Sequence, residues 1–304
     1  MSGVVRLRRS VLFMPASNAR ALDKARTLPA DALVFDLEDA VAPDAKPEAR
    51  QMAVAAVSAG GYAPREVVVR VNALNTPWGR DDLAAVAGSG ADAVLLPKVE
   101  SAGAVHDALG VLGKHGLEAA GAPAGLALWC MLETARGVLR AEAIAAASPR
   151  VAALVMGTSD LTKELRACHT PDRLPLVTSL GLCLLAARAH GLTALDGVHL
   201  DLDDEAGFLA VCRQAAAMGF DGKTLIHPKT IAAANEAFSP SLEEVARARR
   251  IVAAHADAVA EGRGVVVVDG RLVEHLHVEE AHRVMAMAAA IAARRGPPPA
   301  GPPA

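Results

Sequence analysis

Two acidic residues, Glu133 and Asp160, each close a short and strongly apolar run of the sequence. The runs, residues 125–134 and 151–160, are typical of consecutive parallel strands that are buried on both faces. In such an arrangement we expect the two carboxylates side by side at one face of the sheet. Paired hard oxygen ligands, with positions left open for water and substrate, are a common way for enzymes to hold Mg²⁺. The spacing therefore predicts a magnesium site, and the alternative is that each acid caps the helix that follows it.

A third candidate, Arg70, lies in the apolar run of residues 66–72. A guanidinium near a divalent metal is suited to gripping a carboxylate or an enolate oxygen with its planar fork of N–H donors. The alternative interpretation is a salt bridge to acids of the preceding run, which are Asp36, Glu38 and Asp39. Both interpretations hold together, because an arginine that acids fix in place is better oriented toward a ligand.

Two further groups of residues carry weaker signals. Lys98 and Glu100 end another apolar run, and we interpret them as pairing either with each other or with a neighbour. His275, His277 and His282 have a spacing found among metal ligands, but the sequence clusters no further ligand with them. We therefore predict no metal site at these histidines.

Short runs rich in Val, Leu and Ala recur along the chain and must position these residues. Eight such runs occur, at residues 11–15, 32–39, 66–72, 93–100, 125–134, 151–160, 192–201 and 220–228. Helical segments are expected between them, including residues 101–115, a segment from 162 onward, 176–190 and 204–218. Eight strand–helix units of this length predict an α/β fold, the (β/α)₈ TIM barrel, whose active sites lie at the carboxyl ends of the strands. A doubly wound open sheet is the runner-up, but no glycine-rich phosphate-binding motif follows the first run.

A C-terminal appendage of helix, hairpin and helix is expected after the barrel. Ser241 and Glu244 form a capping-box pattern at the start of a helix over residues 241–262. A hairpin over residues 265–274 is expected to turn at Asp269 and Gly270, before a last helix over residues 278–295. The expected boundaries are residues 9–238 for the catalytic barrel, 239–295 for the appendage and 296–304 for a disordered tail of Pro, Gly and Ala.

The composition argues against several other classes of protein. The chain has 304 residues, of which 52% are hydrophobic and 21% are charged, and this is ample for a buried core. A net charge of −3 and only 3% aromatic residues argue against a nucleic-acid partner. No uncharged apolar run reaches ~18 residues, so we expect no membrane span and no membrane partner. Without a secretory pattern, and with four cysteines far apart, we expect a cytoplasmic protein with free thiols.

In these residues and their order the chain resembles the HpcH/HpaI aldolase and citrate lyase β-subunit family, and within it the CoA-ester lyases. The resemblance runs from about residue 9 to residue 287. It rests on Ser10-Val-Leu-Phe-Met-Pro15 with Arg20 and Lys24, Asp36-Leu-Glu-Asp-Ala-Val41 with Lys46 and Arg50, Val69-Arg-Val-Asn72, Leu96-Pro-Lys98, Glu133-Thr134, Gly157-Thr-Ser-Asp160 and Gly222-Lys-Thr-Leu-Ile-His-Pro228. Any one of these motifs is weak alone, whereas their shared order is a strong signal.

The resemblance implies a (β/α)₈ barrel that assembles as a homotrimer or hexamer. It implies that Glu133 and Asp160 hold Mg²⁺, and that Arg70 binds substrate and stabilises a thioester enolate. It also assigns a catalytic role to the acidic cluster after the second strand, which would orient Arg70. That cluster consists of Asp36, Glu38 and Asp39.

The resemblance also implies which residues bind the substrate and move its proton. Arg20 and Lys24 match basic residues that contact the phosphates of CoA, and Phe13 is expected among the substrate-binding residues. The family pattern places a catalytic aspartate shortly after an Asp-Gly pair, but here the pair at residues 269–270 is followed by Glu274. We expect Glu274 to reach a neighbouring subunit's active site and to protonate the enolate carbon.

The activity implied by the resemblance is the Mg²⁺-dependent cleavage or formation of a carbon–carbon bond in a 3-hydroxyacyl-CoA that carries a carboxylate. Malyl-CoA and citramalyl-CoA are examples, and the small-molecule products would be acetyl-CoA and a 2-oxo acid. CoA is then part of the substrate, and Mg²⁺ is the cofactor. Two alternatives stay open, a citryl-thioester lyase subunit of a multi-protein citrate lyase complex and a CoA-independent 2-oxo-acid aldolase.

Overall fold

The computed structural model describes residues 6–115, 125–262 and 265–295, and the chain divides into two compact units. The larger unit is Arg8–Phe238. Of the described residues, the smaller unit contains 6–7, 239–262 and 265–295. The tail predicted at residues 296–304 lies outside the described residues.

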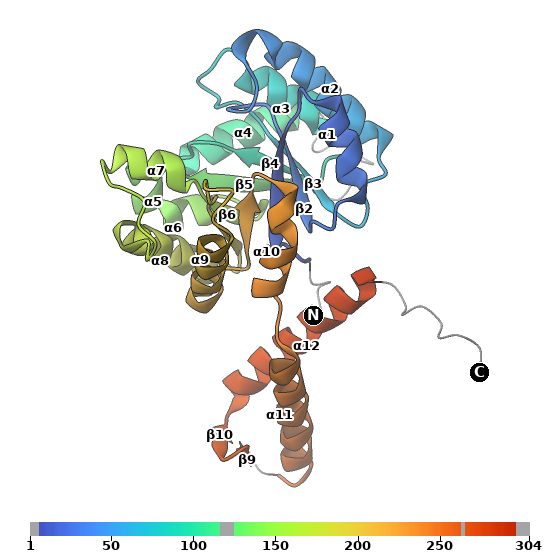
Figure 1. Ribbon diagram of the computed structural model, residues 1–304, viewed down its shortest axis with the longest axis vertical. Coiled ribbons are helices and arrows are strands. Elements are labelled where there is room, and N and C mark those ends of the chain that lie inside the picture. Colours follow the sequence, from blue (N-terminus) through green and yellow to red (C-terminus); the bar gives the residue numbers. More distant parts are fainter. Residues whose placement is uncertain (1–5, 116–124, 263–264, 296–304) are drawn as a thin grey trace, which may run out of the picture. The chain divides into compact units, whose positions relative to one another are not determined.

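Parallel strands of the larger unit close into a barrel, in which each strand pairs with the next and the last pairs with the first (Figure 1). The strands are β1 Ser10–Pro15, β2 Ala32–Asp36, β3 Glu66–Arg70, β4 Ala93–Leu96, β5 Ala127–Leu132, β6 Val151–Met156, β7 Thr193–Asp196 and β8 Gly222–Leu225. The predicted (β/α)₈ TIM barrel is thereby confirmed, and the doubly wound open sheet is excluded.

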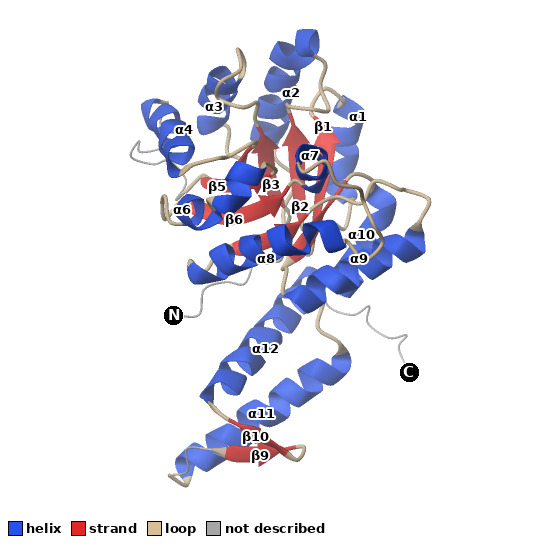
Figure 2. Cartoon of the chain, turned by 90° about the vertical axis from the view of Figure 1, so that its left-hand side faces the viewer, coloured by secondary structure: helices blue, strands red, loops and turns tan. Residues whose placement is uncertain are grey.

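Helices follow the strands and surround the barrel (Figure 2). They are α1 Ala19–Lys24, α2 Lys46–Ala59, α3 Gly79–Ala87, α4 Ala102–Lys114, α5 Ala135–Leu139, α6 Ala141–Ala145, α7 Thr158–Glu164, α8 Leu174–Ala189, α9 Glu205–Met218 and α10 Ile231–Ala237. Short 3₁₀ turns lie at Ala25–Thr27, Pro43–Ala45 and Pro228–Thr230.

The strands read as continuous apolar runs because both of their faces are buried. Side chains that point into the barrel are mostly small or β-branched, such as Ala32, Val34 and Val68. Trp129 of β5 fills part of this interior without exposure to solvent, and the Arg8 guanidinium lies 4.9 Å from the centre of its ring. Alternate strand residues point outward and pack against the helices, which forms the larger apolar core.

Asp196, the acid that ends β7, faces away from the barrel interior, into which its neighbour Leu195 points. Asp196 is fully buried between the barrel and the helices, where it accepts hydrogen bonds from Arg173 at 2.6 and 3.0 Å and from Lys223 at 2.7 Å. Burial alone disfavours the carboxylate, but the charges of Lys223 and Arg173 hold the pKa of Asp196 below its ordinary value. This ion-pair cluster therefore joins β7 and β8 to the residue that precedes α8 and is a structural element of the barrel.

The C-terminal unit is a pair of helices joined by a β-hairpin (Figure 2). Helix α11 Leu242–Ala260 begins at the predicted capping box, in which the side chains of Ser241 and Glu244 each accept from the other's backbone N–H. Strands β9 Val266–Val268 and β10 Arg271–Val273 pair antiparallel, and the turn residues Asp269 and Gly270 have φ of 51° and 73°. These left-handed angles match the two-residue turn predicted for an Asp-Gly pair.

The last helix, α12 His275–Arg295, begins three residues earlier than predicted. Its first turn closes at Glu274, whose carbonyl accepts from the backbone N–H of His277 at 3.0 Å. The ring nitrogen Nδ1 of His277 in turn accepts from the backbone N–H of Glu274 at 3.0 Å. This reciprocal pair resembles a capping box, so His277 serves the start of the helix.

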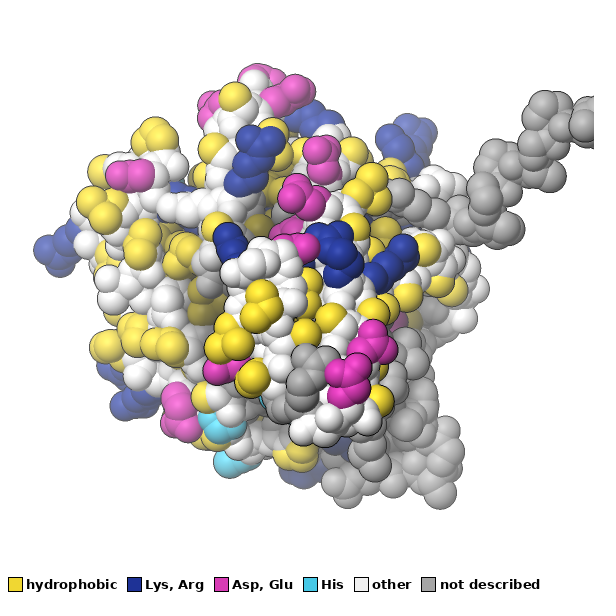
Figure 3. All heavy atoms as spheres, turned by 90° about the horizontal axis from the view of Figure 1, so that it is seen from below, with side chains coloured by type: hydrophobic (Ala, Val, Ile, Leu, Met, Phe, Trp, Pro, Cys, Tyr) yellow, Lys and Arg dark blue, Asp and Glu magenta, His cyan; other side chains and the backbone are white. Residues whose placement is uncertain are grey.

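No helix among the described residues is long and apolar enough to cross a membrane. On the face drawn in Figure 3, Lys and Arg side chains are interspersed with Asp and Glu side chains, so this face carries no continuous field of one charge. Of the four cysteines, Cys130, Cys183 and Cys212 are buried free thiols, whereas Cys168 is exposed.

Replacing the acid of the buried cluster is expected to destabilise the barrel. Asp196→Asn leaves Arg173 and Lys223 buried without their counter-charge, and the free energy of unfolding should fall by about 3–5 kcal/mol. Since the pKa of Asp196 is depressed in the folded state, its stabilisation is present above the ordinary aspartate pKa of about 4 and is lost as the pH falls through the lower folded value. Urea unfolding at several pH values measures both effects.

The matched control is Asp203→Asn, because the Asp203 side chain is exposed and its ion pair with Lys229 spans 3.5 Å. This change should alter the free energy of unfolding by about 0–1 kcal/mol. Equal effects of the two substitutions would contradict a stabilising role for the buried cluster.

Candidate active site

Arg70 and Asp36 form a buried, bidentate ion pair at the carboxyl ends of β3 and β2. The two residues are register partners on neighbouring strands. The guanidinium donates from Nε to Asp36 Oδ1 and from Nη2 to Asp36 Oδ2, each at 2.6 Å. Burial disfavours the charge of Arg70, but the hydrogen bonds and the charge of Asp36 raise its pKa, so the guanidinium stays protonated. The pair fixes the plane of the guanidinium at the mouth of the barrel.

Other side chains from β1, from β5 and from the loop after β2 also surround Arg70, and Met131 of β5 contacts Nη1 through its sulfur at 3.9 Å. The ring of Phe13, on β1, lies 5.1 Å from the guanidinium carbon, which is within the range of a cation–π contact. Glu38 and Asp39, from the loop after β2, approach Nη1 of Arg70 at 2.9 and 3.3 Å. The predicted salt bridge to these acids is therefore present.

The N–H groups that Asp36 leaves available on Arg70 change the expectation that this guanidinium grips a substrate carboxylate. Asp36 occupies the side-on edge of the guanidinium, which is the edge that would grip a substrate carboxylate in bidentate fashion. What remains is the end that carries Nη1, where the contacts with the exposed Asp39 and with the sulfur of Met131, at 3.3 and 3.9 Å, are the weakest. This end suits a single carbonyl or enolate oxygen better than a carboxylate.

The loop after β2 is held by a lysine that sequence reasoning noted only as part of a motif. The Lys46 ammonium is buried and donates to the carbonyls of Leu37 and Glu38 at 2.9 and 2.7 Å and to Asn72 Oδ1 at 2.7 Å. Asp36 itself accepts from the backbone N–H of Glu38 at 2.9 Å. The acids around Arg70 thus sit on an ordered loop.

Glu133 directly follows the last residue of β5 and is buried at the same mouth. Its Oε1 accepts from the backbone N–H of Lys98 at 2.7 Å. It does not cap the following helix, because the hydroxyl of Thr134 does so by accepting from Gly137 N at 3.0 Å. Burial, and after it the charge of Glu38, raise the pKa of Glu133 to about 7.

The sequence predicted that Asp160 closes a strand, but this residue lies in the first turn of α7. Strand β6 ends at Met156, and Gly157 precedes the helix. A Cβ at Gly157 would collide with Cβ and Oε2 of Glu133, so glycine allows the helix start to approach that carboxylate. Among the described residues, the charged partner of Asp160 is the Lys98 ammonium, 3.7 Å from Oδ2.

One cavity of about 440 Å³ brings most of these residues together. Its lining includes Phe13, Asp36, Asp39, Arg70, Glu133 and Asp160. Glu38 contacts Arg70 from beside this lining. In the described ranges no three or more His, Cys, Asp or Glu side chains are arranged to hold a metal, and the carboxylates of the predicted pair, Glu133 and Asp160, both line this cavity.

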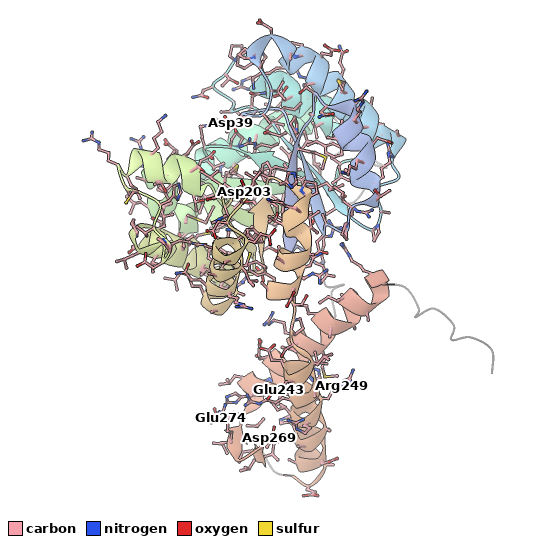
Figure 4. All side chains as sticks on the ribbon, in the orientation of Figure 1. Asp39, Asp203, Glu243, Arg249, Asp269 and Glu274 are labelled. Atoms are coloured by element: carbon pink, nitrogen blue, oxygen red, sulfur yellow. The ribbon has the colours of Figure 1, made fainter. Side chains whose placement is uncertain are left out.

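The remaining predicted site residues lie elsewhere. Arg20 and Lys24 are exposed on α1, which follows β1 and the cavity-lining residue Pro15. In the described chain neither of these two side chains forms an ion pair. Glu274 belongs to the C-terminal unit, where it is exposed at the hairpin end of α12 (Figure 4).

Two features of the cavity were missed or undervalued by sequence reasoning. The hydroxyls of Thr158 and Ser159, which line the cavity, are buried without a hydrogen-bond partner in the described structure. Lys98 pairs with Glu38 at 2.6 Å rather than with Glu100. The motif Gly157-Thr-Ser-Asp160 contains both hydroxyls and could have indicated them. The ion pair of Lys98 with Glu38 joins residues 60 positions apart, so no local sequence pattern indicates it.

Comparison with known proteins places these residues in a family. The model of the HpcH/HpaI aldolase/citrate lyase family matches residues 9–228. The (3S)-malyl-CoA thioesterase of Cereibacter sphaeroides (strain ATCC 17025) is 51% identical, over 94% of this chain and 96% of that protein. The citrate lyase β subunit of Escherichia coli (strain K12) is 38% identical, over 93% and 94% of the two chains.

A solved structure agrees with this assignment. The protein CitE of Mycobacterium tuberculosis, in complex with magnesium, acetoacetate and coenzyme A, superposes with a TM-score of 0.73 and 34% identity. The superposition covers 92% of this chain and 97% of that chain. The resemblance noted in the sequence is confirmed, and the chain belongs to the HpcH/HpaI aldolase/citrate lyase family of enzymes.

Proposed function

We propose that this protein is a Mg²⁺-dependent carbon–carbon lyase acting on a 3-hydroxyacyl-CoA that carries a carboxylate, such as malyl-CoA or citramalyl-CoA. One observation carries the proposal: a single cavity is lined both by the carboxylates of Glu133 and Asp160 and by the anchored guanidinium of Arg70. The two carboxylates suit a divalent cation, and the guanidinium suits the oxygen of a thioester.

The charges at the mouth support a divalent cation. The contacts described above join four carboxylates to two cationic side chains, and a fifth carboxylate, that of Glu133, accepts from the backbone N–H of Lys98. The acids are Asp36, Glu38, Asp39, Glu133 and Asp160, and the cations are Arg70 and Lys98. This network is net negative, and the raised pKa of Glu133 reflects its burial near another acid. Bound Mg²⁺ would supply Lewis acidity and a template for the substrate oxygens.

In the cleavage direction, the residues of the chain handle one proton and one developing charge. The hydroxyl proton of the substrate passes to a carboxylate at the mouth, for which the exposed Asp39 beside Arg70 is the assigned group. The bond between the hydroxyl-bearing carbon and the carbon next to the thioester then breaks. Its electrons form the thioester enolate, whose oxygen the Nη1 end of Arg70 stabilises. Asp36 keeps that end aimed at the cavity.

Two exposed cations near the mouth support the recognition of CoA. Arg20 and Lys24 are one turn apart on α1, and both side chains are free of ion pairs within the described residues. Such side chains suit phosphate groups. A CoA-independent aldolase would have no use for them, so this alternative is less well supported.

Hydrolysis of the same thioester is the second candidate function. It is favoured by the name of the 51% identical relatives, (3S)-malyl-CoA thioesterase, whereas the citrate lyase β subunits are 36–38% identical. Attack of water on the thioester carbonyl would also place negative charge on the oxygen that faces Arg70. The two reactions therefore share a substrate and a site and differ in their products.

Product analysis distinguishes the two reactions. With (3S)-malyl-CoA and Mg²⁺, we expect equal amounts of acetyl-CoA and glyoxylate, measured by chromatography and as the phenylhydrazone. Removing the metal with EDTA should lower the rate by at least about 10²-fold, because a Lewis acid contributes several kcal/mol. Free CoA and malate without glyoxylate would contradict the lyase proposal and establish hydrolysis instead.

We extend the proposal to the C-terminal unit, which would supply Glu274 to the barrel of a neighbouring subunit in a homotrimer or hexamer. Around Glu274 the hairpin and α12 expose Val267, Leu272 and Leu276, each by more than half. Val267 and Leu272 are cross-strand partners on one face of the hairpin. An apolar face beside an acid is typical of a surface that is covered in an assembly. Glu274 would then protonate the enolate carbon.

Complementation tests whether Glu274 acts across subunits. Asp160→Asn and Glu274→Ala should each lower kcat by roughly 10²–10⁴-fold. Co-expressed as mixed oligomers, they should regain about a quarter of the wild-type activity, because some sites combine an intact barrel with an intact neighbour. Glu279→Ala, which changes an exposed acid in the first turns of α12, is the control and should leave the activity unchanged.

Two results would contradict this role. If mixed oligomers stay as inactive as their parents, Glu274 serves the barrel of its own chain. If Glu274→Ala retains full activity, the acid takes no part in the reaction.

A further inference from the structure

The backbone of Lys98 adopts a conformation that residues other than glycine rarely adopt. Lys98 follows β4 by two residues and has a φ of +49°. Residues with a side chain persist in this left-handed region only where the surrounding structure holds them, and such positions cluster at functional sites. In this conformation the N–H of Lys98 donates to Glu133 Oε1 at 2.7 Å.

The side chain of the same residue reaches two other acids. Its ammonium lies 2.6 Å from Glu38 Oε1 and 3.7 Å from Asp160 Oδ2. Glu38 in turn approaches Nη1 of Arg70 at 2.9 Å through its other oxygen. Lys98 therefore contacts both carboxylates of the proposed metal pair and, through Glu38, the group proposed to stabilise the enolate.

We propose that Lys98 is a positioning residue whose ammonium couples the two halves of the site. The inference rests on the proposed function of Glu133 and Asp160 as metal ligands. Toward Arg70, the ammonium holds Glu38 and so helps to aim the guanidinium. Toward the metal, the positive charge of the ammonium repels a divalent cation bound at Asp160. The affinity for the cation is therefore lower than it would be if only the carboxylates of Glu133 and Asp160 were present.

The two effects of the ammonium have opposite signs, which separates this role from simple packing. Like charges a few ångströms apart in a half-buried site repel, and removing one of them tightens the binding of the other. Removing the ammonium also frees Glu38 and loosens Arg70, and a misplacement of about 1 Å lowers a rate by about 10²-fold. A packing residue would instead weaken both binding and rate when it is replaced.

The test compares Lys98→Met with Lys98→Arg and with the control Lys114→Met, since Lys114 is exposed in the last turn of α4. Calorimetric titration of the substrate-free protein with MgCl₂ gives the affinity, and kinetics at saturating Mg²⁺ give kcat. We expect Lys98→Met to bind Mg²⁺ on the order of tenfold more tightly and to lose at least about tenfold in kcat. Lys98→Arg should keep the wild-type Mg²⁺ affinity, and Lys114→Met should change neither quantity.

Two other results would overturn the role of Lys98, and they differ in what they imply for the metal site. If the wild type binds Mg²⁺ and Lys98→Met binds it equally or more weakly, the role of Lys98 fails while the metal assignment stands. If the wild type binds no Mg²⁺, the metal assignment fails and the role of Lys98 fails with it. Lys98→Gln provides a second neutral side chain, with the same expectation as Lys98→Met, should the latter be unstable.

Discussion

The bidentate ion pair between Arg70 and Asp36 is the interaction on which the rest of the barrel mouth depends. A buried arginine is tolerated because its charge is matched by a carboxylate in register on the next strand. Asp36 also accepts from the backbone of the loop that follows it, so the same carboxylate orders the acids beside Arg70. Loss of this pair would leave Arg70 with its contacts to Glu38 and Asp39, and the loop with its bonds to Lys46.

Around this pair the site concentrates more negative charge than its own cations balance. Lys98 contacts Glu38 and Asp160 and donates its N–H to Glu133, so one residue touches three of the acids. Gly157 lets the start of α7 approach Glu133 closely enough for Asp160 to share the cavity. Crowding of carboxylates is costly in a partly buried site, and it is a common arrangement where a divalent cation is to be bound.

Much of the fold, and part of the site, could be predicted from the sequence. Apolar runs at regular spacing identified the barrel, and Glu133 was found because it directly follows a strand. The same pattern could not separate Asp36, which lines the cavity, from Asp196, which faces the helices. Strands that are apolar on both faces do not reveal which alternate residues point inward. Lys98 was undervalued because its left-handed backbone and its distant partners leave no mark in the local sequence.

The claim that Glu133 and Asp160 form a divalent-cation site is tested most directly by diffraction from crystals grown in MnCl₂, with Mn²⁺ standing in for Mg²⁺. An anomalous difference map should show one peak in the cavity, within roughly 2.0–2.2 Å of a carboxylate oxygen of each residue. Crystals of Asp160→Asn should lack this peak. A peak that persists in Asp160→Asn, or a cavity without any peak at saturating Mn²⁺, would contradict the account.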